Sequence, residues 1–148
     1  MTDTATAPTT GDAAPAALDA FKFRLNFFKL VVRDAAAMTA FYQDTFGFEV
    51  RSRFELPGII EVMLALPGEQ FTLVLYQNTD GREVVIGTGH GPVGFLTRDV
   101  DGAYAHALAS GAQDERAPFD LPGMRIAFVK DPEGHQIEMI QLMRPAAA

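Results

Sequence analysis

The chain has 148 residues, 48% of them hydrophobic and 21% charged, which is typical of one soluble globular domain or of two half-size modules that share a core. Its net charge of -7 and the lack of a basic run argue against a nucleic-acid partner, and no apolar stretch approaches the roughly 20 residues that span a bilayer. The absence of cysteine excludes disulfides, thiolate metal sites and a cysteine nucleophile.

Residues 1–20 consist mostly of Ala, Thr, Pro, Asp and Gly, a composition that predicts a flexible N-terminal tail. The segment has neither the basic start nor the apolar middle of a secretory signal, so we expect a cytoplasmic protein. The folded domain is then expected to cover residues 21–148.

The first half of this domain alternates apolar runs with turn residues. An aromatic and β-branched run over residues 21–32 predicts a strand. Asp34 is a suitable N-cap for a helix through Phe46, apolar residues recur there with helical spacing, and Gly47 ends the helix. Three further strands are predicted over residues 48–55, 59–66 and 71–77.

The second half repeats this order. A strand over residues 93–97 precedes a helix that begins after Asp99 and ends at Gly111. Residues 113–123 are polar and contain proline, so we expect a connection with a short strand at most. The last element is a hydrophobic hairpin over residues 124–141, which reverses at Asp131–Gly134.

The two halves can be aligned as an internal repeat. Val31–Asp34 resembles Leu96–Asp99, and Pro67 corresponds to Pro132. The modules are expected at about residues 21–80 and 90–143, and a module of this size barely buries one sheet face, so the two should pack together. The predicted fold is α+β, with two βαβββ modules that form a curved eight-stranded cup.

Alternation along the strands assigns one face to the helices and the other to the concave side of the cup. The predicted concave face is mainly apolar with few polar side chains, which is typical of a small-molecule site. Its candidate ligand-binding and catalytic residues are Phe27, Lys29, Glu61, Met63, Val74, Tyr76, Pro92, Phe128, Gln136 and Glu138. Phe27, Tyr76 and Phe128 would stack on a planar ligand or serve in ordinary core packing.

This combination resembles the vicinal oxygen chelate superfamily, which includes glyoxalase I, extradiol dioxygenases, and fosfomycin- and bleomycin-resistance proteins. The features that carry the resemblance are the β-α-β-β-β repeat, the strand-Arg-Asp-helix pattern over Val32–Gly47 and the sequence of Asp131–Glu138. The resemblance implies a small-molecule ligand in the cup and a homodimer.

Metal-dependent members of this superfamily bind a divalent ion at four positions that fall here on Phe27, Val74, Pro92 and Glu138. Only Glu138 has a donor side chain, whereas a catalytic zinc site typically has three protein ligands. We therefore expect no cofactor; the alternative is a divalent metal ion at a displaced site with Glu138 and His90. We expect His135, in the tight turn, to be solvated.

Lys29 lies two residues from the lost ligand position at Phe27, where an ammonium group would supply positive charge. It would pair with Glu138, hold a ligand carboxylate or enolate, or act as a base or Schiff-base amine. The structural alternative is an ion pair with Glu138 or Glu61. Glu138 is interpreted either as a working acid or as a remnant of the ligand set.

The functional hypothesis is a protein that binds an apolar or aromatic small molecule, either as a sequestering, resistance-type binder or as a metal-independent enzyme. The alternative hypothesis is a metal-dependent, glyoxalase-like lyase or isomerase, or a dioxygenase, with its displaced site at Glu138.

Overall fold

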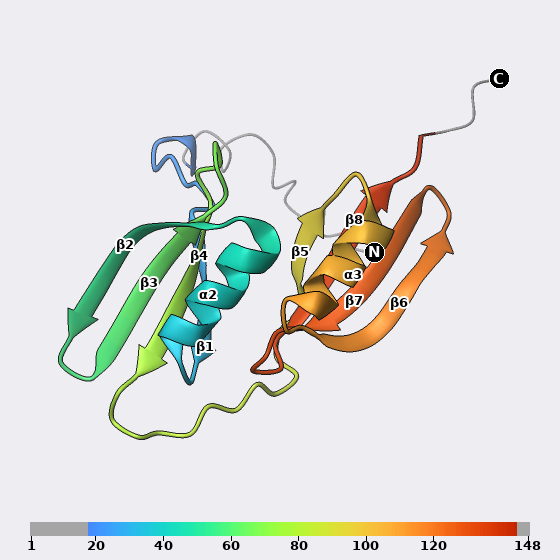
Figure 1. The fold of residues 1–148 in the computed structure, drawn as a ribbon. Coiled ribbons are helices and arrows are strands. Elements are labelled where there is room, and N and C mark those ends of the chain that lie inside the picture. The colour runs from blue at the N-terminus through green and yellow to red at the C-terminus, as the bar shows by residue number, and fades with distance from the viewer. Residues whose placement is uncertain (1–17, 145–148) are drawn as a thin grey trace, which may run out of the picture.

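The computed structural model describes residues 18–144, so the predicted tail lies outside the described residues except for residues 18–20. Figure 1 shows two modules side by side, each with one helix against one sheet. The first contains β1 (Phe27–Val32), α2 (Ala35–Phe46), β2 (Glu49–Leu56), β3 (Ile59–Ala65) and β4 (Thr72–Asn78). The second contains β5 (Val93–Leu96), α3 (Val100–Ala109), β6 (Gln113–Leu121), β7 (Met124–Lys130) and β8 (Gln136–Leu142). The predicted α+β class and the two βαβββ modules are confirmed.

The eight strands form two separate four-stranded sheets, with strand orders β1-β4-β3-β2 and β5-β8-β7-β6. Strand β1 runs parallel to β4, and β5 runs parallel to β8. The other strand pairs are antiparallel. The register places Lys29 beside Val74 and Gly94 beside Glu138, so the two modules repeat the same arrangement. No strand pairing joins the two sheets within residues 18–144, and the chain forms no closed barrel.

Helix α2 begins and ends where its sequence predicts. The Asp34 carboxylate accepts a hydrogen bond of 3.0 Å from the Ala37 backbone N–H, which satisfies one of the unpaired amides of the first turn. Gly47 ends the helix at φ 76°, a left-handed conformation that favours glycine. The predicted apolar face of the helix is buried against the sheet, including Met38 and Tyr42.

A repeated glutamine ties each helix to its own sheet. The Gln77 side-chain oxygen accepts a hydrogen bond of 2.8 Å from the Ala35 backbone N–H. In the second module Gln141 accepts the corresponding bond of 2.9 Å from Val100. Each glutamine therefore satisfies an amide at a helix N-terminus that no helical carbonyl can reach.

The two modules share one hydrophobic core cluster. Phe46, at the end of α2, stacks on Phe95 of β5 with ring centroids 4.0 Å apart. His106 of α3 lies outside the concave faces, and its Nε2 is 2.9 Å from the Asp44 carbonyl oxygen. At these contacts the modules meet through α2, and no continuous sheet joins them within residues 18–144.

Two predicted strand boundaries are wrong. The first strand begins at Phe27 instead of residue 21, because its partner β4 begins at Thr72 and offers nothing for the earlier residues to pair with. Residues 113–123 are not a connection, since residues 113–121 form strand β6 at the sheet edge. Proline is tolerated on an edge strand, and Pro118 falls within a register shift between Arg116 and Phe119.

None of the helices in the described part of the chain is long and apolar enough to span a membrane.

Candidate functional site

The predicted division of the sheets into two faces is confirmed. In the first module Leu30, Val62 and Leu75 lie in the core under α2. The opposite face of this sheet carries the predicted site residues Phe27, Lys29, Glu61, Met63, Val74 and Tyr76. Val74 is fully buried at the centre of this concave face, whereas Phe27 at its edge is exposed.

Lys29 pairs with Glu61 and not with Glu138. Its Nζ contacts Glu61 Oε1 across the intervening strand β4, and the two side chains are 40% and 17% exposed. The same nitrogen lies 5.8 Å from the centroid of the Phe27 ring and 5.2 Å from that of Tyr76. Of the alternatives for Lys29, the structure therefore shows the ion pair with Glu61, held between two aromatic rings whose faces attract a cation.

The second module presents Glu138 at the corresponding place on its concave face, beside Gly94 and Phe128. Within residues 18–144 its carboxylate takes part in no hydrogen bond or ion pair. A Cβ at Gly94 would meet nothing within 4 Å, so the space next to Glu138 is open. Glu138 is thus available to a ligand.

The other predicted residues of this module already have partners. The Gln136 amide donates to the Glu115 carboxylate at 3.0 and 3.1 Å. Phe128 stacks on Phe119 with a centroid distance of 6.4 Å, and the Arg116 guanidinium covers Phe119 at 3.4 Å. These contacts shape one side of the concave face. Pro92 lies immediately before β5.

The donor atoms within one chain do not fit a complete metal site. The described residues contain no group of three or more His, Cys, Asp or Glu side chains that would hold a metal ion. His90 packs edge-on against Phe28, with ring centroids 5.9 Å apart, and its Nδ1 lies 3.0 Å from the Gly91 carbonyl oxygen. Glu138 and His90 alone fall short of the three protein ligands of a catalytic zinc site.

The expectation that His135 is solvated is wrong, since only 2% of this residue is exposed. Its Nδ1 lies 2.8 Å from the buried Asp131 carboxylate and its Nε2 lies 2.9 Å from the Val31 carbonyl oxygen of β1. The Tyr42 hydroxyl of α2 donates to the same carboxylate at 2.9 Å. Both ring nitrogens of His135 face acceptors, so the doubly protonated ring satisfies both contacts.

The pKa of His135 follows from these contacts. Burial, the largest influence, lowers the pKa, but the hydrogen bond and charge of Asp131 together with the Val31 carbonyl outweigh it and raise the pKa above its ordinary value. Burial and the neighbouring Asp131 raise the pKa of the Tyr42 hydroxyl far above its usual range. The cluster therefore joins the His135 ring, the buried Asp131 carboxylate and the Tyr42 hydroxyl, and its contacts favour the protonated ring.

The turn between β7 and β8 also contacts the first module through a second carboxylate, that of Glu133. Glu133 accepts hydrogen bonds from the backbone N–H groups of Arg33 and Asp34, the latter at 3.1 Å. Glu133 and His135 thus join the turn between β7 and β8 to the end of β1, and Asp131 joins it to α2. Sequence reasoning missed this joint; the available signal was Tyr42 on the buried face of α2, a hydroxyl that needs a partner.

Comparison with known proteins places these features in a family. Residues 24–139 match the model of the Glyoxalase/Bleomycin resistance protein/Dioxygenase superfamily. A lactoylglutathione lyase from Arabidopsis thaliana is 31% identical over 116 residues, which cover 74% of this chain and 41% of the plant protein. A putative lactoylglutathione lyase from Brassica oleracea is also 31% identical, over 81% of this chain and 45% of its own length. The chain therefore spans less than half the length of these curated relatives.

Solved structures show the same fold. A variant of glyoxalase I from Zea mays has a TM-score of 0.76 and 26% identity, covering 89% of this chain and 50% of the maize chain. A member of the superfamily from Sphaerobacter thermophilus has a TM-score of 0.68 and 28% identity, covering 82% of this chain and 98% of its own.

These relatives contradict the expectation that the protein needs no cofactor. Lactoylglutathione lyases are enzymes of the glyoxalase I type, and that type depends on a metal ion. The prediction rested on Phe27, Val74 and Pro92, whose side chains have no donor atoms for a metal ion. The lack of donors at these positions does not establish chemistry without a metal.

Proposed function

Because this chain belongs to the Glyoxalase/Bleomycin resistance protein/Dioxygenase superfamily, we propose that it binds an apolar or aromatic small molecule on the concave faces of its two sheets. The observation that carries the proposal is the exposed apolar surface of these faces, which includes Phe27, Phe54 and Leu56 in the first module and Leu96 and Leu142 in the second. An apolar surface with a few polar groups is the usual character of a ligand site.

The polar groups on these faces give the ligand an orientation. Lys29 and Glu61 form a fixed pair between the Phe27 and Tyr76 rings, whereas Glu138 has no partner within residues 18–144. In this proposal the two rings stack on the ligand, Lys29 contacts its polar oxygen atoms, and Glu138 accepts or donates a proton or binds a cation.

The proposal includes a homodimer in which a cup closes between two copies of the chain. Its support is that β1 and β5 are edge strands of separate sheets and that apolar side chains remain exposed on both concave faces. An exposed strand edge and an uncovered apolar face are both typical of an interface. Light scattering should give twice the chain mass, and a monomer at micromolar concentration would contradict this part of the proposal. A cytoplasmic location stays a prediction.

Thermal-shift measurements test ligand binding. A library of aromatic acids and polyketide-like compounds should contain ligands that raise the melting temperature in proportion to their occupancy. The Phe27→Ala variant should bind them more weakly, while Arg53→Gln, a charge change in the first module away from the concave face, should bind them like the natural sequence. Equal shifts for both variants would place the ligand elsewhere.

A second candidate function is a glyoxalase-like lyase or isomerase, or a dioxygenase, that uses a divalent metal ion. It is favoured by the relatives named lactoylglutathione lyase and by the unengaged carboxylate of Glu138. Formation of lactoylglutathione should then require added metal ion and be lost in Glu138→Gln, and the same variant should lose metal affinity in a calorimetric titration. Metal-independent turnover by Glu138→Gln would rule this candidate out.

A further inference from the structure

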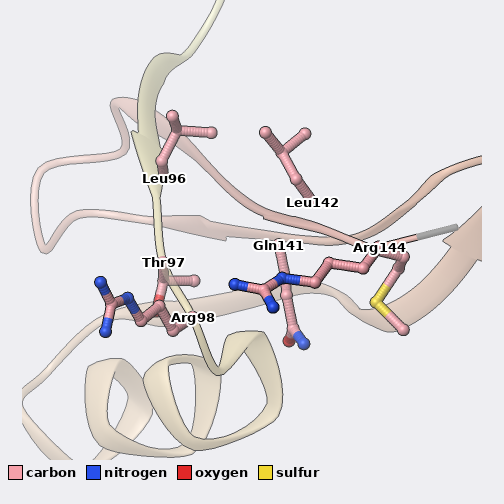
Figure 2. A pocket seen from close by; sticks show the side chains of 7 residues that line it. Leu96, Thr97, Arg98, Gln141, Leu142 and Arg144 are labelled. Carbon is pink, nitrogen blue, oxygen red and sulfur yellow. The ribbon is translucent and has the colours of Figure 1, made fainter.

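A hollow lies where β5 and β8 end, and it includes Leu96 and Leu142 of the concave face that the proposed function uses. Its volume is about 740 Å³, and it is lined by Leu96, Thr97, Arg98, Gln141, Leu142, Met143 and Arg144. Figure 2 shows Leu96 and Leu142 on one side of the strands, while Gln141 turns toward the helix. Leu96 is 72% exposed and Leu142 is 63% exposed, so the hollow has an uncovered apolar wall.

The hollow continues the concave face that carries Glu138. Side chains of every second residue share a face, so Glu138, Ile140 and Leu142 lie in one row on β8, with Leu96 of β5 beside Ile140. Four residues along a strand correspond to about 13 Å. An apolar row of that length therefore connects the Glu138 carboxylate to the hollow.

The far end of this row is positively charged. Arg98 and Arg144 both line the hollow, and within residues 18–144 neither forms an ion pair. In Figure 2 the Arg144 side chain extends from the end of β8 toward Thr97. Two arginines without carboxylate partners are notable in a chain whose net charge is -7.

The internal repeat allows the end of β5, next to the hollow, to be compared with the end of β1 in the first module. Arg33 is the repeat counterpart of Arg98. There the Glu133 carboxylate accepts a hydrogen bond from the Arg33 backbone, and its oxygen lies 3.8 Å from the Arg33 guanidinium. A carboxylate from the same chain thus occupies one strand end, whereas the other strand end opens onto the hollow.

We infer that the ligand of the proposed function is an elongated monocarboxylate, whose carboxylate binds at Arg98 and Arg144 while its apolar body lies along Leu96 and Leu142. This inference rests on the proposed function and assigns the chemical class of its ligand. Guanidinium groups bind carboxylates through paired, charge-assisted hydrogen bonds. The opposite end of the row carries Glu138, which repels a second carboxylate, so a dicarboxylate is disfavoured.

Calorimetric titration of the full chain tests the inference with phenyloctanoate, its uncharged amide and the shorter phenylacetate. We expect phenyloctanoate to bind roughly tenfold more tightly than the amide, the factor that one charge-assisted contact supplies. Phenylacetate, which cannot cover the apolar row, should bind more weakly than phenyloctanoate. The double variant Arg98→Gln, Arg144→Gln should bind acid and amide equally, while Arg53→Gln should keep the preference for the acid.

Equal binding of acid and amide to the natural sequence overturns the inference but leaves the proposed apolar site in place. A double variant that still binds the acid more tightly than the amide also overturns the inference and leaves the proposed apolar site in place. If neither compound binds, the inference fails, and the thermal-shift library separately decides the proposed function. Light scattering on the same samples tests whether the arginines contact a second copy of the chain and not a ligand. If the double variant changes oligomeric state, the arginines serve an interface and the inference is overturned.

Discussion

At the scale of single residues, the pairing of Lys29 decides what this side chain can do. The ion pair with Glu61 is partly exposed, and pairs of this kind contribute about 0.2–1 kcal/mol to stability. The rings of Phe27 and Tyr76 nevertheless fix the ammonium group in one place on the concave face. A group that contributes little to stability but is held in a defined position is well suited to contact a ligand.

Replacing Lys29 with Met should therefore separate binding from folding. We expect the free energy of unfolding to fall by no more than about 1 kcal/mol, since the pair is partly exposed. Affinity for a ligand found by thermal shift should fall several-fold, because its polar oxygen atoms lose their cation. Urea unfolding and calorimetric titration measure the two effects, with Arg53→Gln as a charge-matched control. Unchanged affinity would make Lys29 a structural residue.

At the scale of elements, the turn between β7 and β8 joins the two modules through His135. Its contacts run from His135 to the Asp131 carboxylate and to the Val31 carbonyl oxygen of the first module. The charged groups nearby are Glu133 in the same turn and Arg33 after β1, and the cavity next to His135 is also lined by Lys29 and His90. Loss of the ring proton would leave one of the two contacts without a hydrogen.

Stability should consequently depend on pH through His135. The pKa of His135 is raised in the folded state, so its contribution is complete below the pKa of the unfolded chain, about 6.5, and is lost as the pH rises through the folded pKa. Urea midpoints measured between about pH 6 and 9 should fall with pH. His135→Gln should flatten this slope, whereas a substitution of the exposed His90 to Gln should preserve it. Identical slopes in all three proteins would contradict the prediction.

At the scale of the whole molecule, the modules are joined by aromatic packing and the His135 turn, and no sheet hydrogen bonds link them. The stacked rings of Phe46 and Phe95 are the centre of this contact, and core residues from both modules belong to one cluster. A shared core makes the two modules unfold together, as small single domains usually do.

Phe95→Ala should weaken the junction between the modules. Because Phe95 is only partly buried, we expect a loss of about 3 kcal/mol, the low end for phenylalanine-to-alanine changes in a core. Phe54→Ala, which removes an exposed ring, provides the matched control and should cost far less. Calorimetric and urea unfolding should show one transition for the natural sequence, and two resolved transitions would contradict a shared core.

Features that depend on residues close together in the chain could be predicted from the amino-acid sequence. These features include the Asp34 N-cap, the Gly47 C-cap and the alternation of strand faces. The internal repeat shows each pattern twice, so the two modules and the residues of the concave faces could be predicted from the sequence pattern alone. Prediction failed at residues 21–26 and at β6, because a strand exists only where a partner strand lies beside it.

The contacts between charged groups could not be predicted in this way, because they depend on how distant segments pack. His135 becomes buried because Val31, more than a hundred residues earlier in the chain, and Tyr42 of α2 supply its surroundings. Lys29 had two candidate acids on the same predicted face, and the pairing of β3 with β4 brought Glu61 within reach. Glu138 stayed without a partner within residues 18–144 because its sheet does not join that of Lys29. Ion pairs and burial depend on the packing of distant segments, which residue spacing does not encode.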